Sequence, residues 1–477
     1  MTEILNIIKN KAEITFNKKV DNIIKLKQSG SYRNYYRIFF DQSTILGVYN
    51  PDKQENIAFV CFANHFKNLG LNVPKILANF EQENIYFIED LGDTTLYDYL
   101  QQCTNENQKI EIYKKVIDKL IDFQIKAIDN LDLSKAYPKA EFDKQSILWD
   151  LNYFKYMVLK IAKVPFDEQK LEYEFEILSS SLINVDSNYF LYRDFQSSNI
   201  MFFNNEIYFI DFQGGRKGSF YYDLASLLFD SKAKLCHQTR QLLLEYYFKQ
   251  FSNIKPIDYK TYEKNFYNFV LIRILQASAA YCFRGLVEKK LSFIATIPYS
   301  IENIKFLLEN KHISEQLPQL RQSLEFYANY SQVAQMFSNQ RKVKVRINSF
   351  SFIKSGYPAD EMNNEGGFVF DCRLLPNPGA LEQYKRFCGL DAEIQTYLSG
   401  FEEVETFIVK CTEIVLNAIE SYENKQYEHL QVNFGCTGGK HRSVYCAQKT
   451  YEILKNIFKI DVEIKHIELE KINSQIL

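Results

Sequence analysis

Several common signals are scarce or missing in this sequence of 477 residues. It has one tryptophan and ten prolines, and its nine cysteines contain no Cys-x-x-Cys spacing. A zinc framework or a set of disulfides is therefore not indicated, and reduced thiols in a cytoplasmic protein fit better. The N-terminal stretch has no apolar segment ending in small residues, which predicts that there is no signal peptide.

Neither sign of charge is in excess. Lys and Arg total 57 against 59 Asp and Glu, so the overall charge does not point to nucleic acid or to an anionic membrane. The apolar run at 269–283 is broken by Arg273 and Gln276, which argues against a membrane span. What is present is a globular composition, 46% apolar and 24% charged, in a chain long enough for two or three domains.

The first two thirds of the chain begin with short strands and continue with helices. Residues 23–49 alternate β-rich runs with turn signals, which predicts three antiparallel strands. A helix is expected at about 55–69 and a strand near 84–92. A loop and a β-hairpin follow later, with Asn204-Asn205 at the hairpin turn. The remaining segments have helical periodicity and lie at 107–126, 145–163, 166–184 and 221–335.

The composition changes near residues 335–343. From there strands alternate with helices, which predicts a small, mainly parallel α/β domain. Within it, "GGFVFDCRLLPNP" is predicted to be a buried strand that runs into a proline-rich loop. The helices are expected at 404–423 and 441–458.

The segment "RDFQSSNIMFFNNEIYFIDFQ" spaces three polar side chains closely. Asp194 is followed five residues later by Asn199, and the hairpin then leads to Asp211. Phosphoryl transfer needs a carboxylate that takes the proton of the attacking hydroxyl, and it needs oxygen ligands for Mg²⁺. The spacing predicts Asp194 as the base and Asn199 and Asp211 as metal ligands. The alternative is a surface loop with an Asx turn.

Together with "GSYRNYYRIFF", "LWDLNYF" and "YDLASLL", this segment resembles the aminoglycoside phosphotransferase-type kinases, over about residues 23–308. The similarity looks closest to the AmgK-like anomeric kinases of N-acetylmuramate and N-acetylglucosamine. It implies an α+β bilobal protein-kinase-like fold over residues 1–335, with an N-lobe at about 1–90 and a C-lobe at about 91–335. It further implies an ATP- and Mg²⁺-dependent kinase of a cell-wall amino sugar that acts at the anomeric hydroxyl.

Other residues carry a functional and a structural interpretation. Gly30 and Ser31 could bring backbone N–H groups to the triphosphate or could form a simple hairpin turn. The resemblance assigns backbone hydrogen bonds with adenine to the stretch from Glu89 to Leu91, which is otherwise a strand end. Tyr192 and Asp223 are expected to support the loop that carries Asp194. Trp149 and Asp150 either contact the sugar or pack in the core.

The chain departs from this kinase family at identifiable positions. Tyr192 stands where the family usually has His, and Gln196 and Ser198 replace residues that are often His and Arg. The third strand, "TILGVY", lacks the lysine that many kinases pair with the nucleotide phosphates. Arg37 or Lys53 could substitute for it.

Near the C-terminus, "FGCTGGKHRSV" predicts an anion site between a strand and a helix. The glycines let successive amides point inward, the helix start adds positive potential, and an arginine can clamp a phosphate. The residues of this loop are Cys436, Thr437, Gly438, Gly439, Lys440, His441, Arg442 and Ser443.

The same loop has the spacing of a cysteine phosphatase. Cys436 would then be a thiolate nucleophile and Asp371 a general acid. Such phosphatases generally have His before the nucleophile, whereas this chain has Gly435.

Residues 344–472 resemble the C-terminal domain of the RapZ RNase-adaptor family, which is taken to bind amino-sugar phosphate and, in full-length adaptors, small RNA. The resemblance implies that this domain, at 343–477, seats a phosphate in its loop, with Asp371, Arg373 and Asn377 lining the pocket. Counted from residue 341 there are 17 Lys and Arg against 19 Asp and Glu, so nucleic acid is a minority expectation.

Three functions follow from these patterns. The first is a sugar kinase with a sugar-phosphate-sensing module and no membrane association. The second is a non-catalytic pseudokinase regulator that binds amino-sugar phosphate or RNA. The third is a cysteine-dependent phosphatase.

Overall fold

A computed structural model describes residues 2–26, 33–331, 333–334, 337, 343–359 and 367–474. The chain divides into two compact units. The first comprises Met1–Ala280 and Tyr299–Ala328, and the second comprises Tyr281–Pro298 and Asn329–Leu477. The predicted boundary near 335–343 differs from this division at two places, since residues 281–298 and the residues that directly follow Ala328 group with the second unit.

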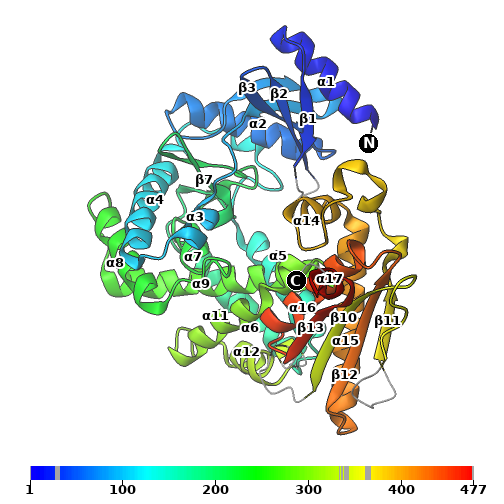
Figure 1. Ribbon diagram of the computed structural model, residues 1–477. Helices are drawn as coiled ribbons and strands as arrows, with labels where there is room; N and C mark the ends of the chain where they lie inside the picture. Colours follow the sequence, from blue (N-terminus) through cyan, green and yellow to red (C-terminus); the bar gives the residue numbers. More distant parts are fainter. Residues whose placement is uncertain are drawn as a thin grey trace. The chain divides into compact units, whose positions relative to one another are not determined.

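The first unit opens with a five-stranded antiparallel sheet in the order β1-β2-β3-β5-β4. Figure 1 labels three of its strands, β1, β2 and β3. The predicted trio of antiparallel strands at 23–49 is confirmed. Helix α1 (Thr2–Phe16) packs Ile8 and Ala12 against apolar side chains of this sheet. The strands are β1 (Asn22–Lys25), β2 (Asn34–Phe40), β3 (Ser43–Tyr49), β4 (Ile76–Phe80) and β5 (Ile85–Glu89).

Helix α2 (Lys53–Asn68) follows the third strand. The carboxylate of Asp52 caps it by accepting hydrogen bonds from the N–H groups of Gln54 and Glu55. Its buried face includes Phe59 and Phe66. The Phe59 ring stacks on Phe212, and the Phe66 ring packs edge-on against it. Phe212 lies at the end of the segment that carries Asp194, Asn199 and Asp211. This aromatic packing fixes the position of α2 relative to that segment.

The rest of the first unit is mainly helical. Strand β6 (Tyr189–Leu191) pairs with β9 (Arg216–Gly218), and β7 (Ile200–Phe203) forms the predicted hairpin with β8 (Glu206–Phe209). Both turn residues, Asn204 and Asn205, have positive φ, as a two-residue hairpin turn requires. Its helices from residue 96 onward are α3 (Leu96–Gln102), α4 (Glu106–Lys126), α5 (Lys144–Phe154), α6 (Glu168–Ile183), α7 (Tyr221–Leu228), α8 (His237–Ser252), α9 (Tyr259–Cys282), α11 (Ile297–Glu309) and α12 (Pro318–Tyr330). Helix α10 (Leu291–Ile294) lies in the segment 281–298, which groups with the second unit.

One helical stretch among the described residues, Tyr259–Val287, is long and apolar enough to cross a membrane by length and composition alone. Its most apolar window is 61% buried inside the fold. That burial is the behaviour of a core helix, and Arg273 within it contacts other side chains of the first unit.

The second unit contains a four-stranded sheet in the order β11-β12-β10-β13, with parallel pairing throughout. The prediction of a mainly parallel α/β domain is confirmed. The prediction of a buried strand at β11 is wrong, because β11 is an edge strand and the Val369 side chain is 43% exposed. The elements are β10 (Lys344–Ser351), β11 (Gly367–Asp371), α14 (Ala392–Ser399), α15 (Glu402–Asn424), β12 (His429–Cys436), α16 (Arg442–Asn456), β13 (Val462–His466) and α17 (Ile467–Ser474).

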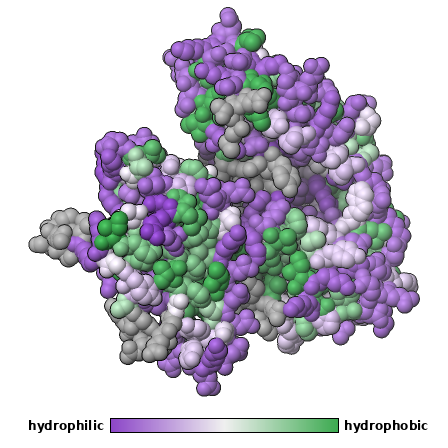
Figure 2. Space-filling view, turned by 90° about the vertical axis from the view of Figure 1, so that its right-hand side faces the viewer, coloured by the Kyte–Doolittle hydropathy of each residue, from purple (hydrophilic) through white to green (hydrophobic). Residues whose placement is uncertain are grey.

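Some large apolar side chains of this second unit are exposed. Ile353 and Leu374 are each at least 70% exposed, and Tyr357 is 57% exposed. The face drawn in Figure 2 is largely hydrophilic and carries apolar patches between its polar areas.

Candidate active site and anion loop

A buried carboxylate supports the loop between β6 and β7. Asp223 in α7 accepts hydrogen bonds from the backbone N–H groups of Tyr192 at 2.8 Å and Arg193 at 3.0 Å. Complete burial raises the pKa of Asp223 to about 7, while these N–H groups favour its ionised form. Asp223 therefore holds the backbone at the start of the loop that carries Asp194.

The side chain of Tyr192 ties this loop to the next site residue. The ring is 1% exposed, and its hydroxyl donates a hydrogen bond to the backbone carbonyl of Ile210. Ile210 directly precedes Asp211, so the tyrosine links the loop to the predicted metal ligand. A tyrosine at a position where the family usually has His therefore leaves the loop anchored.

A second anchor lies further along the chain. Both the N–H and the hydroxyl of Ser197 donate to Asp230 Oδ2, at 3.0 and 2.5 Å. Asp230 is 2% exposed and lies 33 residues after Ser197. Local spacing does not reveal a pair of residues that lie so far apart in the sequence.

The predicted base is accessible and faces a buried cation. The Asp194 side chain is 49% exposed, and its Oδ1 lies 3.4 Å from Nη2 of Arg273 in α9. Arg273 is held by hydrogen bonds to Ser226 at 2.9 Å and to Gln276. In the sequence, Arg273 is visible as the charged residue that interrupts the apolar run at 269–283.

The two predicted metal ligands lie in adjoining backbone. The Asn199 side chain donates through Nδ2 to the carbonyl of Asp194 at 2.9 Å, and Ile210 N–H bonds to the Asn199 carbonyl at 3.1 Å. Asp211 follows Ile210 with φ of 68°, an uncommon conformation outside glycine. The fold thus brings Asp194, Asn199 and Asp211 together.

The oxygens of this set suit Mg²⁺. Because Asn199 uses its amide nitrogen for the internal bond, its Oδ1 points elsewhere, and Asp211 is 35% exposed. Two protein oxygens with nucleotide phosphates and water are the usual surroundings of Mg²⁺. Among the described residues no group of three or more His, Cys, Asp or Glu side chains could hold a metal, so phosphate oxygens would have to complete the site.

The two residues predicted near the sugar have different surroundings. Asp150 is 6% exposed and forms a bidentate ion pair with Arg193, with contacts of 2.7 and 2.5 Å. Trp149 is 47% exposed, and Lys139 lies 5.3 Å from its ring centre. Asp150 supports the catalytic loop through Arg193, while the indole is the group available to a ligand.

The predicted nucleotide residues are only partly described. Gly30 and Ser31 lie outside the described residues. Leu91 is buried, and Glu89 N–H donates to the Lys75 carbonyl at 3.0 Å. Arg37 on β2 makes bidentate contacts with both Asp90 and Asp93, between 2.7 and 3.0 Å, so it binds the segment after β5.

A different arginine contacts one of the predicted metal ligands. The side chain of Arg33 is fully buried and pairs with Glu55 at 2.6 Å and with Asp211 at 3.0 Å. Lys53, the other candidate, pairs with Glu81 at 3.2 Å, and both are more than half exposed. Sequence reasoning did not identify Arg33, because it precedes β2 rather than lying on the third strand.

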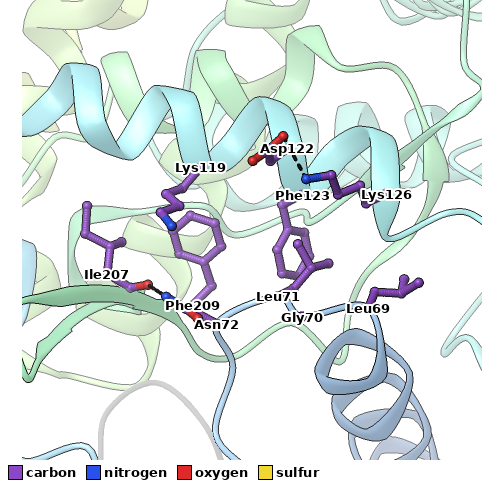
Figure 3. A pocket seen from close by; sticks show the side chains of 10 residues that line it. All are labelled: Leu69, Gly70, Leu71, Asn72, Lys119, Asp122, Phe123, Lys126, Ile207 and Phe209. Atoms are coloured by element: carbon purple, nitrogen blue, oxygen red, sulfur yellow. Dashed lines mark hydrogen bonds and ion pairs between the residues drawn. The ribbon is translucent and has the colours of Figure 1, made fainter.

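A cavity of about 70 Å³ opens elsewhere in the first unit (Figure 3). Lys126 pairs with Asp122 at 3.1 Å on its α4 side, and Asn72 donates to the Ile207 carbonyl at 3.1 Å on the other. None of the predicted site residues lines it. The lining residues are Leu69, Gly70, Leu71, Asn72, Lys119, Asp122, Phe123, Lys126, Ile207 and Phe209.

In the second unit, the loop between β12 and α16 winds around the sulfur of Cys436. The Sγ accepts a hydrogen bond from Gly439 N–H at 3.2 Å and lies 3.1 Å from Ser443 Oγ. The Thr437 carbonyl accepts from the Ser351 hydroxyl at 2.6 Å. Cys436 is 3% exposed, so the sulfur lies beneath the loop.

The outer part of the loop has free space at one residue. A Cβ added to Gly438 would meet no atom within 4 Å, whereas Gly439 has φ of +65° and crowded surroundings. Lys440 Nζ donates to the carbonyls of Lys385 and Arg386, both at 3.1 Å. His441 is the N-cap residue of α16, so the loop ends at a helix start.

The arginine of the loop faces a neighbouring segment. Arg442 Nη1 donates to the carbonyls of Arg373 at 2.9 Å and Leu375 at 3.1 Å. The Arg373 guanidinium in turn pairs with Asp371 and lowers the pKa of that carboxyl. Arg442 therefore holds this segment beside the loop, and an ionised Asp371 is poorly suited to act as a general acid.

The last predicted pocket residue also lies near the loop. Asn377 Oδ1 and His441 Nδ1 lie 3.4 and 3.2 Å from the position that a Cβ on Gly379 would occupy. The residues predicted around the anion loop are thus gathered in one place, with Arg442 turned toward backbone carbonyls.

Two family descriptions match the chain. Residues 23–263 match the Phosphotransferase enzyme family, and residues 343–470 match the RapZ C-terminal domain. The first match spans half of the sequence and contains the catalytic loop, while the second contains the anion loop.

The curated relatives match the second region. A nucleotide-binding protein of Thermotoga neapolitana is 41% identical over 130 residues, which are 27% of this chain and 44% of that protein. A nucleotide-binding protein of Bacillus cytotoxicus is 34% identical over 140 residues, 29% of this chain and 46% of that protein. The chain thus spans less than half of the length of these relatives.

Solved structures of two kinases are similar to part of the chain. The choline kinase LicA from Streptococcus pneumoniae has a TM-score of 0.45 and 13% identity, over 63% of this chain and 98% of that chain. The Plasmodium vivax ethanolamine kinase has a TM-score of 0.47 and 13% identity, over 61% of this chain and 84% of that chain.

Proposed function

Because the chain belongs to the phosphotransferase enzyme family, we propose that it transfers the γ-phosphoryl group of ATP to a cell-wall amino sugar. The acceptor would be N-acetylmuramate or N-acetylglucosamine at the anomeric hydroxyl, and the reaction would take place in the cytoplasm. The observation that carries this proposal is the gathering of Asp194, Asn199 and Asp211 around one loop.

Each residue has a role that its geometry allows. The half-exposed carboxylate of Asp194 would accept the proton of the attacking hydroxyl, and Arg273 would hold that carboxylate in place. Asn199 Oδ1 and the Asp211 carboxylate would hold Mg²⁺. The ion, when bound, neutralises charge on the β- and γ-phosphates.

The second unit would bind a sugar phosphate, a product or a downstream metabolite, and regulate the kinase. The open space at Gly438 and the start of α16 at His441 suit a phosphate group. The match to the RapZ C-terminal domain supports this assignment.

The kinase proposal is tested by measuring ATP consumption with a panel of amino sugars, with and without glucosamine 6-phosphate. We expect turnover with one of the two named sugars and at least a 100-fold loss in Asp194→Asn, within the range of general-base catalysis, roughly 10²–10⁴-fold. Asp118→Asn is the control, since Asp118 is an exposed carboxylate on α4 that bonds to the Tyr246 hydroxyl.

Nucleotide binding without turnover of any sugar would favour the pseudokinase alternative. Against that alternative, the Tyr192 hydroxyl still reaches the Ile210 carbonyl and keeps the loop anchored. RNA binding by the second unit would support the adaptor form of this alternative.

The phosphatase alternative draws on the two contacts to the Cys436 sulfur, from Gly439 N–H and Ser443 Oγ. It predicts hydrolysis of p-nitrophenyl phosphate that disappears in Cys436→Ser. We expect no such hydrolysis, because the sulfur is buried and Asp371 is held ionised by Arg373.

A further inference from the structure

The Arg33 guanidinium joins two carboxylates from different elements. Nη2 lies 2.6 Å from Glu55 Oε1 in the first turn of α2, and Nη1 lies 3.0 Å from Asp211 Oδ1 after β8. The arginine side chain is 0% exposed. A buried guanidinium is costly unless it is paired, so both contacts are part of the fold and not surface ion pairs.

Glu55 is fixed independently of the arginine. Its Oε2 accepts a hydrogen bond from Asn50 Nδ2 at 2.7 Å, and its backbone N–H bonds to the Asp52 cap at 3.1 Å. A carboxylate in the first turn is also favoured by the helix dipole. Glu55 therefore has a fixed position, and its ion pair with Arg33 helps to hold the guanidinium in place.

At Asp211 the contacts fall on one oxygen. Oδ1 accepts from Arg33 at 3.0 Å and from Gln213 Nε2 at 2.9 Å. Two donors on Oδ1 set the rotation of the carboxylate and turn Oδ2 to the opposite side. A group oriented in this way can offer Oδ2 to a metal ion without rearrangement.

Kinases commonly use a lysine on the third strand that pairs with a helix glutamate and approaches the nucleotide phosphates. Strand β3 of this chain reads STILGVY and has no lysine. We propose that Arg33 is a positioning residue that connects α2, through Glu55, to Asp211 and thereby sets the affinity for magnesium-bound nucleotide. This inference rests on the proposed kinase function.

The test is calorimetric titration of the full chain with ATP over a series of Mg²⁺ concentrations and, separately, in EDTA. Arg33→Met keeps an unbranched apolar side chain and removes the guanidinium group with its charge. We expect the half-saturating Mg²⁺ concentration to rise about tenfold or more, the loss typical of a charge-assisted hydrogen bond. ATP binding in EDTA should change less, whereas a merely structural defect would weaken both.

Two further variants complete the set. Arg33→Lys keeps the positive charge but loses the planar fork of donors and some of its reach, so it should give an intermediate Mg²⁺ requirement. Lys155→Met is the matched control, because Lys155 is also a buried cation paired with two glutamates, Glu168 and Glu172, and neither of them is a predicted metal ligand. Its Mg²⁺ requirement should equal that of the wild type.

The outcomes separate the two proposals. A wild-type chain that does not bind Mg²⁺ and ATP together overturns the proposed function, and this inference with it. Wild-type binding together with an unchanged Mg²⁺ requirement in Arg33→Met overturns the inference alone. If Arg33→Met does not fold, the same titration is made with Glu55→Gln. An unchanged Mg²⁺ requirement in Glu55→Gln also overturns the inference.

Discussion

Single hydroxyl and carboxylate groups hold the catalytic loop in place. Tyr192, Ser197 and the buried Asp223 and Asp230 each contribute hydrogen bonds to its backbone or to the strand end beside it. None of the four has to touch a substrate to do so. Substitutions at these positions are therefore expected to act on stability as well as on turnover.

Tyr192→Phe removes one hydroxyl and leaves the partly buried Ile210 carbonyl without its donor. We expect a loss of about 1–2 kcal/mol in the free energy of unfolding, together with slower turnover. The measurement is denaturant unfolding combined with a kinase assay. Tyr113→Phe is the control, because the Tyr113 ring is also fully buried and its hydroxyl has no hydrogen-bond partner among the described residues. Equal losses in both variants would contradict the assigned role.

Sequence patterns locate the loop residues better than they locate their partners. Asp194, Asn199 and Asp211 lie within 18 positions, so their spacing is visible. Arg33 and Asp211 are 178 positions apart, and Arg273 and Asp194 are 79 apart. Only tertiary packing brings such pairs together, which is why sequence reasoning proposed Arg37 and Lys53 and did not find Arg33.

At the level of elements, alternating patterns and turn residues predict most strands and helices. The hairpin at Asn204 and Asn205 is determined locally, because these residues accept positive φ. Strand β11 is different, since its apolar residues suggest burial although it lies at a sheet edge. A strand's place in the sheet order depends on partners elsewhere in the chain.

Two adjacent glycines in the anion loop are expected to respond differently to alanine. A Cβ on Gly439 would lie 2.4 Å from the Glu468 side chain and 3.0 Å from Ser351 N, at a φ of +65°. Gly439→Ala should therefore destabilise the second unit by about 1–3 kcal/mol. Thermal unfolding measures this loss.

Gly438→Ala serves as the matched variant. Its methyl group enters open space, so the unfolding free energy should change by about 0.5 kcal/mol or less. The affinity for glucosamine 6-phosphate should fall, because the methyl group would occupy the place proposed for the phosphate. Wild-type affinity in Gly438→Ala would argue against a phosphate at this position.

At the scale of the whole molecule, the backbone crosses between the two units more than once. The backbone passes from the first unit to the second after Ala280, returns after Pro298, and passes over again after Ala328. Residues 281–298 are held in the second unit by contacts such as the Lys289–Glu413 ion pair at 2.8 Å and the burial of Ile294. A pattern of strands and helices does not reveal such an excursion, because the segment is helical like its neighbours.

A protease that nicks the backbone once between residues 328 and 343 would leave a long fragment whose 281–298 stretch is still embedded among residues of the shorter one. The two pieces should co-elute on a sizing column in native buffer and separate only in denaturant. Spontaneous separation of the two fragments in native buffer would show that residues 281–298 do not hold the shorter fragment to the longer one.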